Sequence, residues 1–399
     1  MELKRPDALL LDCLRADSPL SGKSGLEGLT PSDWREVVGQ AMRHKIAPYL
    51  YLRLKNLRLS ELVPREIMVA LREFFFRSAA RNLRLYSRLS KVLGLLKDED
   101  ISVIVLKGAY LDEAVYQRIG TRAFNDVDLL FRKGDLLRCQ KKLMHEGYYP
   151  IQDNLPLDIH WDFDLAPSPV RVDMRAIWKR ARPDIIADVP VQVLSPEDLI
   201  IHLCLHLAVK NLFEYVGLRT FCDIREIIER YHGQLKWDDL AGRVGEWGAG
   251  NGVYLTLLLA RELLNAHVPD SLLKMLRPED LDPSVRDWAL DQIFWSRGSS
   301  LSLSPYFWQL WQPCSLREKT AHFLKLIYPP REYVSREYPA PYGSSRNYFY
   351  YLVRVKDHFS RYVRAVWRMV IRDEKMLSLA ERQRKNSAIM EWLSSSPGT

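Results

Sequence analysis

Long hydrophobic runs are absent from this sequence of 399 residues. No window approaches the roughly 20 consecutive apolar residues that a helix needs to span a bilayer. The N-terminal stretch holds one short apolar run, and Asp12 interrupts it, so it does not have the pattern of a signal peptide. The sequence therefore predicts a protein without a membrane-spanning helix.

Cysteine is also scarce. The five cysteines are scattered along the chain and never form a Cys-x-x-Cys pair. An odd number without paired spacing argues against a disulfide framework and against a zinc knuckle. This usage fits a reducing cytoplasm best, so we expect a cytoplasmic protein.

What is present is the composition of a globular protein with a basic bias. Apolar residues make up 47% and charged residues 27% of the chain, which is long enough for two or three domains. The formal net charge is +8 and the isoelectric point is about 9.1. Such an excess favours polyanionic partners such as nucleic acid, nucleotides or an anionic membrane surface, although it also suits an ordinary soluble protein.

The order of helical and mixed patterns divides the chain into four regions. Residues 1–98 predict helices, residues 99–194 predict alternating strands and helices, and residues 195–300 predict a second helical domain. Residues 301–399 combine an aromatic and proline-rich segment with a basic C-terminal helix. We therefore expect an α+β fold, in which a small mixed β-sheet with an α/β arrangement is flanked by N-terminal and C-terminal helical regions.

Local signals place the individual elements. Strands are predicted at residues 101–106, 127–131, 148–151, 157–161 and 191–194. Helices are predicted from Thr30 and from Asp173, and at residues 64–97, 109–117, 135–146, 199–210, 218–231, 237–247, 251–266, 284–295, 316–327 and 347–379. The last of these is basic and amphipathic, and we expect it to pack on its own protein or to lie on a membrane surface.

Two features lie close together at the first two strands. Lys107-Gly108 follows the first strand, and a glycine before a helix lets backbone N–H groups approach phosphate oxygens. Asp126 and Asp128 belong to the next strand, where alternation directs both side chains to one face. Two neighbouring carboxylates repel each other unless a cation lies between them. The arrangement predicts a divalent-metal site beside a phosphate site, and so phosphoryl or nucleotidyl chemistry.

A two-metal site needs a third carboxylate on a neighbouring strand, and two residues are candidates. Asp173 precedes a helical pattern, so a role as helix N-cap explains it. Asp158 lies within a strand pattern, where no structural role accounts for a carboxylate. We therefore prefer Asp158 and keep Asp173 as a second choice.

At this point a resemblance becomes specific. The run LKGAYLDEAVYQRIGTRAFNDVDLLF resembles the core of the polymerase-β-like nucleotidyltransferase superfamily, and more narrowly a bacterial family of uncharacterised nucleotidyltransferases. That family has Lys-Gly after a strand, an Arg before Asp-x-Asp-Leu-Leu, a Gly-Tyr after a helix, and an acid-x-His-Trp strand. The matching positions are Lys107, Gly108, Arg122, Asp126 to Leu130, Gly147, Tyr148 and Asp158 to Trp161. Later segments (MRAIWKRA, SPEDLIIHLCLHL and LRTFCDIREII) also match, so the resemblance covers about residues 100–230.

The resemblance implies an enzyme. It would transfer a nucleoside monophosphate from an NTP such as ATP to an acceptor hydroxyl or phosphate, releasing pyrophosphate, with Mg²⁺ or Mn²⁺ as cofactor. Asp126 and Asp128 would bind both metal ions and the triphosphate. Asp158 would complete the acceptor-side metal site and help to deprotonate the attacking group.

The nucleotide phosphates would lie on the turn after the first strand. The resemblance implies that Gly108 and the backbone after it, beginning with Ala109, hold the β- and γ-phosphates. The superfamily usually has a small hydroxyl residue after the glycine, and Ala109 lacks that hydrogen bond. Lys107 and Arg122 are the cationic contacts that could replace it.

Other polar residues have two possible roles each, one functional and one structural. His160 could position the acceptor or pack beside Trp161, and Arg118 could contact phosphate or be a solvated loop arginine. His202 and His206 share a helix face, but Leu203 occupies the position where a metalloprotease motif needs glutamate. We expect these two to be buried, hydrogen-bonded histidines rather than zinc ligands.

Two other functions compete with the transferase. One is a non-catalytic or regulatory relative that binds a nucleotide, and the other is a metal-dependent phosphohydrolase with an Asp-x-Asp on a strand. The helical regions carry no recognisable RNA-binding signature. The sequence therefore leaves a small molecule, a peptide and RNA open as the acceptor.

Overall fold

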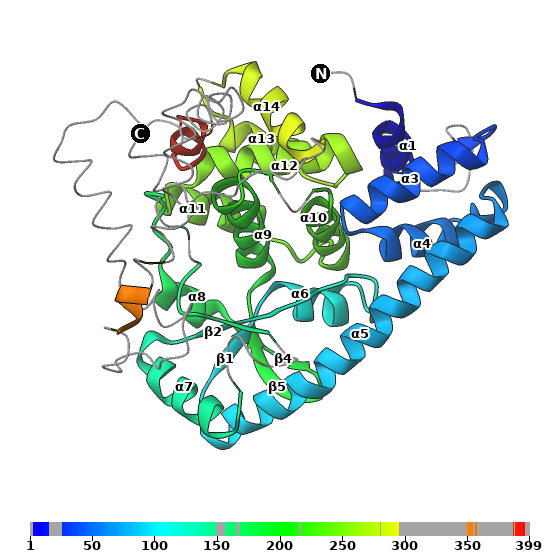
Figure 1. Cartoon of the computed structure of the whole chain (residues 1–399). Helices are drawn as coiled ribbons and strands as arrows, with labels where there is room; N and C mark the ends of the chain where they lie inside the picture. Colours follow the sequence, from blue (N-terminus) through cyan, green and yellow to red (C-terminus); the bar gives the residue numbers. More distant parts are fainter. Residues whose placement is uncertain are drawn as a thin grey trace.

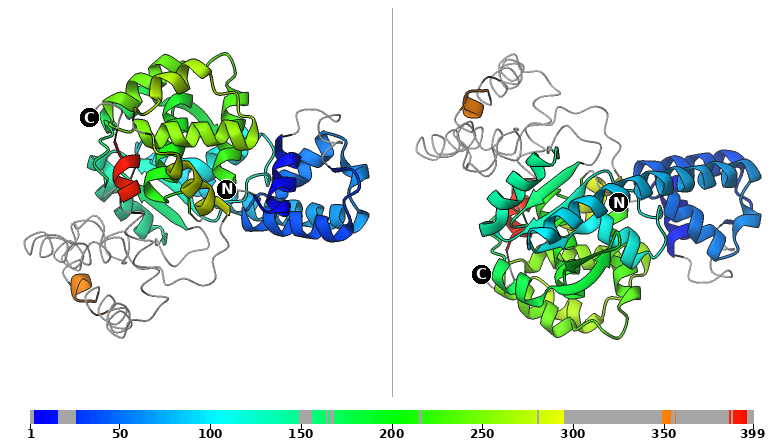
Figure 2. Two further views of the ribbon diagram at one scale, coloured as in Figure 1. Left: turned by 90° about the horizontal axis from the view of Figure 1, so that it is seen from above. Right: turned by 90° about the horizontal axis from the view of Figure 1, so that it is seen from below.

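The computed structural model describes residues 3–15, 26–148, 156–163, 165, 168–214, 217–279, 281–294, 349–353, 356, 386 and 388–395. A β-sheet occupies one side of the molecule, and a layer of helices that begins with α9 (Pro196–Leu205) covers it (Figure 1). A separate group of N-terminal helices lies beside these two layers (Figure 2).

The N-terminal helices are α1 (Arg5–Arg15), α3 (Pro31–Arg43), α4 (Ala47–Asn56), the short η1 (Ser60–Leu62) and α5 (Arg65–Asp98). Thr30 and Asp33 form the capping box that starts α3, because each side chain accepts a backbone N–H of the other. The 34 residues of α5 make a helix about 51 Å long, which runs from the N-terminal helices to the sheet (Figure 1). The starts of α3 and α5 agree with the sequence prediction.

The sheet has five strands in the order β3-β2-β1-β5-β4. They are β1 (Val103–Val105), β2 (Val127–Phe131), β3 (Leu157–His160), β4 (Arg182–Ile186) and β5 (Val189–Val193). The pairs β1–β2 and β4–β5 are antiparallel, whereas β1–β5 and β2–β3 are parallel. The sheet is therefore mixed, and with the surrounding helices it confirms the α+β prediction.

Short helices connect the strands. They are α6 (Lys107–Tyr110), the π-helical turn η2 (Leu111–Val115), η3 (Lys133–Asp135), α7 (Leu136–His145) and α8 (Met174–Arg180). Asp173 caps α8 by accepting the backbone N–H groups of Arg175 and Ala176. This is the N-cap role that the sequence predicts for Asp173.

The helical layer follows β5. Ser195 caps α9, every residue of which is buried, and the π-helical turn η4 (His206–Lys210) continues it. The remaining helices are α10 (Arg219–Arg230), α11 (Trp237–Glu246), α12 (Gly250–Leu264), α13 (Asp270–Leu276) and α14 (Pro283–Phe294). Among the described residues, no helix combines the length and the apolar content needed to cross a membrane.

Some elements were not placed individually by the sequence pattern. The helices α1, α4 and α13 lie within regions that were predicted to be helical only as a whole. The strand β4 was not predicted; it is an edge strand whose exposed positions include Pro183 and Ile185. An edge strand tolerates proline and charge, so its sequence lacks the apolar pattern of a central strand.

Three predicted elements cannot be matched to the structure in full. In the predicted strand 148–151, Tyr148 is not in a strand, and residues 149–155 lie outside the described part. The predicted helix at 316–327 and most of that at 347–379 also lie outside it, although residues 349–353 are helical.

Candidate active site

The parallel pair of β2 and β3 brings three polar side chains together. Asp128 pairs in register with Asp158, and Leu130 pairs with His160. Because side chains alternate along a strand, Asp158 and His160 share the sheet face on which Asp128 lies. Asp128, Asp158 and His160 each offer a ligand atom within 4.8 Å of the others. We call these three residues the metal cluster.

Asp128 is the centre of this cluster. Its Oδ1 lies 2.9 Å from Lys107 Nζ and 3.0 Å from His160 Nε2, and its side chain is almost fully buried. His160 Nε2 also lies 3.2 Å from Asp158 Oδ2. Burial alone would raise the pKa of Asp128, but the Lys107 ammonium and His160 hold it far below its ordinary value. Asp128 is therefore a carboxylate at neutral pH, with cationic or hydrogen-bonding groups already directed at it.

The turn after β1 positions Lys107. Its φ of +41° is in the left-handed region, which side chains other than glycine seldom adopt, and such conformations are frequent at functional sites. Gly108 follows in a space that has no room for a side chain, since an added Cβ would lie 2.7 Å from Phe124 Cβ. Ala109 is fully buried, and its carbonyl accepts a hydrogen bond from Tyr86. The phosphate contacts expected at Gly108 and Ala109 remain a prediction.

Arg122 lies in a buried ion pair. Its Nε is 3.0 Å from both carboxylate oxygens of Asp223, which is fully buried and also accepts a hydrogen bond from Tyr116. The Arg122 side chain is only 7% exposed. The Arg122 guanidinium therefore already has a structural partner. Arg118 is exposed, and its guanidinium lies 5.1 Å from the centre of the Phe75 ring.

Asp126 lies outside the metal cluster. It precedes the first residue of β2 and is exposed, so it is not held in the strand alternation that the sequence predicts. Its charge acts instead on two cations, Lys45 and Arg219. Its role as a metal ligand remains a prediction.

Sequence analysis did not connect Lys45 and Arg219 with the site. His44 Nδ1 accepts the backbone N–H of Leu218 at 3.3 Å, and Arg219 Nη1 donates to the Ala123 carbonyl at 3.3 Å. These bonds bring the end of α3, the start of α10 and the segment before β2 together. Burial and the neighbouring Arg122 lower the pKa of Arg219 to about 10, so it remains a cation at neutral pH. No sequence motif reveals this, because His44 and Leu218 are 174 positions apart.

Each histidine of the predicted pair meets the expectation in one respect only. His206 is hydrogen-bonded as predicted, with Nδ1 3.1 Å from Asn211 Nδ2, but it is only partly buried. His202 is buried, but neither of its ring nitrogens has a hydrogen-bond partner among the described residues. The expectation of a hydrogen-bonded His202 is therefore wrong. Periodicity indicates that a residue is buried, but not whether a partner faces it.

The donor set of the cluster fits a divalent cation. Carboxylate oxygens suit Mg²⁺ and Mn²⁺, and an imidazole is a frequent ligand of transition metals. Asp158 is about half exposed, so the cluster has access to solvent on one side, whereas Asp128 and His160 are buried. A cation at these atoms would be held by two carboxylates in contact with a buried face of the sheet.

The pH dependence of stability tests the His160 contacts. Burial lowers the pKa of His160, but hydrogen bonds to Asp128 and Asp158 outweigh it and raise the pKa above 6.5. Protonated His160 therefore stabilises the metal-free fold fully below pH 6.5, and this contribution is lost as the pH rises through the raised pKa. We expect unfolding by urea, followed in EDTA, to show this loss in the wild-type chain. A His160→Gln variant should lack the step, and an identical step in that variant would assign it to another group.

Comparison with known proteins identifies a family. A family model described as an uncharacterised nucleotidyltransferase matches residues 30–265, which is more than half of the chain. The matched region extends from the cap of α3 to the end of α12 and contains the whole sheet. No curated protein and no solved structure matches the chain significantly.

Proposed function

The chain belongs to this nucleotidyltransferase family, and from that premise we propose that it transfers a nucleoside monophosphate from an NTP to an acceptor hydroxyl or phosphate. The observation that carries the proposal is the metal cluster, in which Asp128 and Asp158 are register partners on parallel strands. A bound divalent ion, Mg²⁺ or Mn²⁺, would supply charge stabilisation at the transferring phosphoryl group.

Each residue of the metal cluster would have a different role in the reaction. Asp128, held ionised by Lys107 and His160 in the metal-free protein, would be a metal ligand in the loaded protein. Asp158 is more exposed and would help to remove the proton of the attacking hydroxyl. His160 bridges the two carboxylates and fixes their separation. Asp126, two residues before Asp128, would complete the metal sites on the solvent side.

The phosphates would meet cations from three segments. Lys107 lies at the turn after β1, and Lys45 and Arg219 lie beside Asp126. No carboxylate among the described residues forms an ion pair with Lys45 or Arg219, so both can bind a phosphate group. These two take the role that sequence analysis gave to Arg122, whose guanidinium already pairs with Asp223. They also offset the missing hydroxyl at Ala109.

The proposal is tested with NTPs labelled at the α-phosphate, Mn²⁺ or Mg²⁺, and acceptor panels of metabolites, peptides and RNA. We expect pyrophosphate release together with label on one acceptor class. Asp126→Asn should lower this release by about 10²-fold, the scale for one group that stabilises transition-state charge. Release of inorganic phosphate in place of pyrophosphate would favour the phosphohydrolase. Metal-dependent NTP binding without transfer to any acceptor would favour a non-catalytic relative.

A further inference from the structure

His202 of α9 is a buried polar side chain that the fold leaves unpaired. It is 2% exposed, and neither Nδ1 nor Nε2 has a hydrogen-bond partner among the described residues. A buried imidazole without partners destabilises a fold, because its donor and its acceptor both lose the hydrogen bonds that water provides. Phenylalanine or leucine would fill the same space without this cost. The position of His202 therefore calls for a reason outside the protein's own packing.

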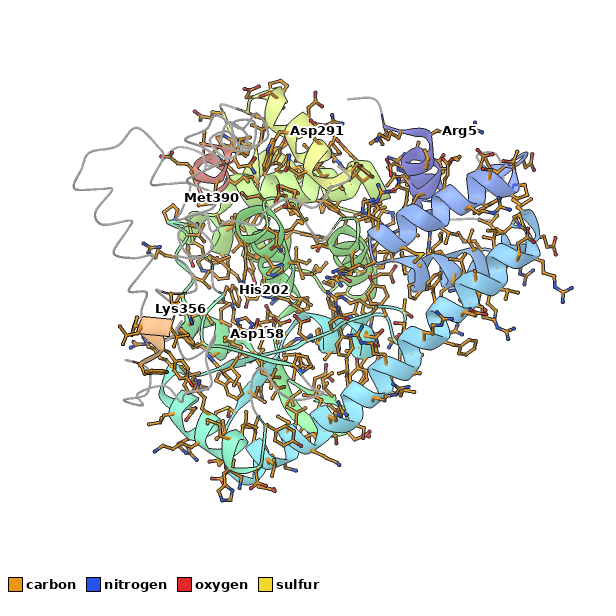
Figure 3. The ribbon with its side chains drawn as sticks, in the orientation of Figure 1. Arg5, Asp158, His202, Asp291, Lys356 and Met390 are labelled. Atoms are coloured by element: carbon orange, nitrogen blue, oxygen red, sulfur yellow. The ribbon has the colours of Figure 1, made fainter. Side chains whose placement is uncertain are left out.

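The surroundings of His202 connect it with the metal cluster. Its ring packs against Phe163, three residues after His160, with ring centroids 4.3 Å apart. Lys107, Asp128 and His160 all act electrostatically on the ring. Figure 3 labels His202, which belongs to α9, and Asp158, which belongs to β3 of the sheet below that helix in the view. His202 thus lies across the site from β2 and β3, on the helix that covers them.

The ring is suited to donate one hydrogen bond. Burial and Lys107 hold the pKa of His202 well below 6.5, so the imidazole is neutral and carries one N–H. The group of ligand atoms that lie within 4.8 Å of one another includes Asp128, Asp158 and His160 but not His202, so the ring is not placed to join these metal ligands. A neutral donor beside the Lys107 ammonium fits an anionic oxygen, which only accepts hydrogen bonds.

We propose that His202 is a substrate-binding residue of this site and donates a hydrogen bond to a phosphate oxygen of a nucleotide held at the metal cluster. The inference rests on the proposed function and names a contact that the family resemblance did not suggest. The Lys107 ammonium would attract the same phosphate group electrostatically, and the hydrogen bond from His202 would orient it. The neighbouring His206 differs from His202 in that one of its ring nitrogens, Nδ1, already pairs with Asn211.

The test compares His202→Phe with His206→Phe, one turn further along the same helix. Binding of Mn²⁺–tripolyphosphate and of Mn²⁺ alone is measured by titration calorimetry, and thermal unfolding is recorded in EDTA. We expect His202→Phe to bind Mn²⁺–tripolyphosphate about tenfold more weakly, to bind Mn²⁺ as the wild type does, and to unfold at the same or a higher temperature. His206→Phe should keep the wild-type affinity and unfold at a lower temperature. His202→Gln should recover part of the affinity, because its amide retains a donor.

The outcomes separate this inference from the function it rests on. If Asp128→Asn loses tripolyphosphate binding and His202→Phe does not, the role of His202 is wrong and the metal cluster stands. Equal loss of Mn²⁺ binding in His202→Phe would make it a metal ligand and overturn the phosphate contact. A wild-type chain that binds neither probe would overturn both proposals. His202→Leu replaces the Phe variant in the same comparison if that variant does not fold.

Discussion

Replacing Asp128 by Asn is expected to reduce pyrophosphate release by about 10³-fold, the upper range for losing one group that stabilises transition-state charge. The substitution keeps the shape of the side chain but removes the charge to which Lys107 and His160 are directed. Asn also removes one of the two negative charges that the cluster offers to a divalent ion. Initial rates at saturating NTP and Mn²⁺ would measure the effect, and calorimetry should show weaker Mn²⁺ binding.

Asp173→Asn is the matched control for this experiment. Asp173 was the other candidate for the third carboxylate, and it caps α8 outside the metal cluster. Asn is as good an N-cap as Asp, so both the stability and the transfer rate should stay near those of the wild type. A loss of activity in Asp173→Asn as large as that in Asp128→Asn would contradict our choice of Asp158. Equal activity of Asp128→Asn and the wild type would refute the metal cluster itself.

Replacing Arg122 by Ala is expected to lower the free energy of unfolding by about 3–5 kcal/mol, the cost of leaving one member of a buried ion pair alone. Asp223 is fully buried, and Arg122 contacts both of its carboxylate oxygens. Asp223 would keep its hydrogen bond from the neutral Tyr116 hydroxyl and a weaker electrostatic interaction with Arg219, but it would lose the cation in direct contact with both oxygens. Urea unfolding monitored by tryptophan fluorescence would measure the loss.

Two further variants distinguish a structural from a nucleotide-binding Arg122. The double variant Arg122→Leu/Asp223→Leu removes both charges and should recover a large part of the lost stability, because apolar replacement of a buried pair is often close to neutral. Arg118→Ala removes an exposed arginine and should change stability by no more than about 1 kcal/mol. If Arg122→Ala unfolds like the wild type but binds NTP weakly, the nucleotide contact predicted from the sequence is the correct role.

The elements that the sequence predicts well are those with a strong local signal. Capping residues at Thr30, Asp173 and Ser195 mark the starts of α3, α8 and α9, because the cap and the first turn are adjacent in the chain. The β2 strand is fully buried and reads as a short apolar run. The β4 strand is an edge strand, so its alternation is weak and only pairing with β5 defines it.

The candidate site also has features that local sequence predicts and features that depend on contacts between distant segments. Register pairing of β2 with β3 places Asp158 beside Asp128, whereas Asp173 caps α8. The choice of Asp158 as the third carboxylate, made from the strand pattern, remains a prediction. Ion pairs and missing partners depend on contacts between distant segments. For that reason sequence analysis did not reveal the Arg122–Asp223 pair, the Lys45 and Arg219 cations, or the unpaired state of His202.

The contact between Lys107 and Asp128 has a consequence for how the site is loaded. The ammonium occupies the carboxylate oxygen that a divalent ion would use, so the free protein carries its own counter-ion at this point. If a divalent ion binds as proposed, loading would be an exchange of cations, in which Asp128 is not left as an unpaired buried charge. This exchange would free Lys107, which lies at the turn after β1 in a left-handed backbone conformation, to contact the triphosphate proposed to bind there. Lys107 would thus neutralise Asp128 in the metal-free protein and bind phosphate in the metal-bound protein.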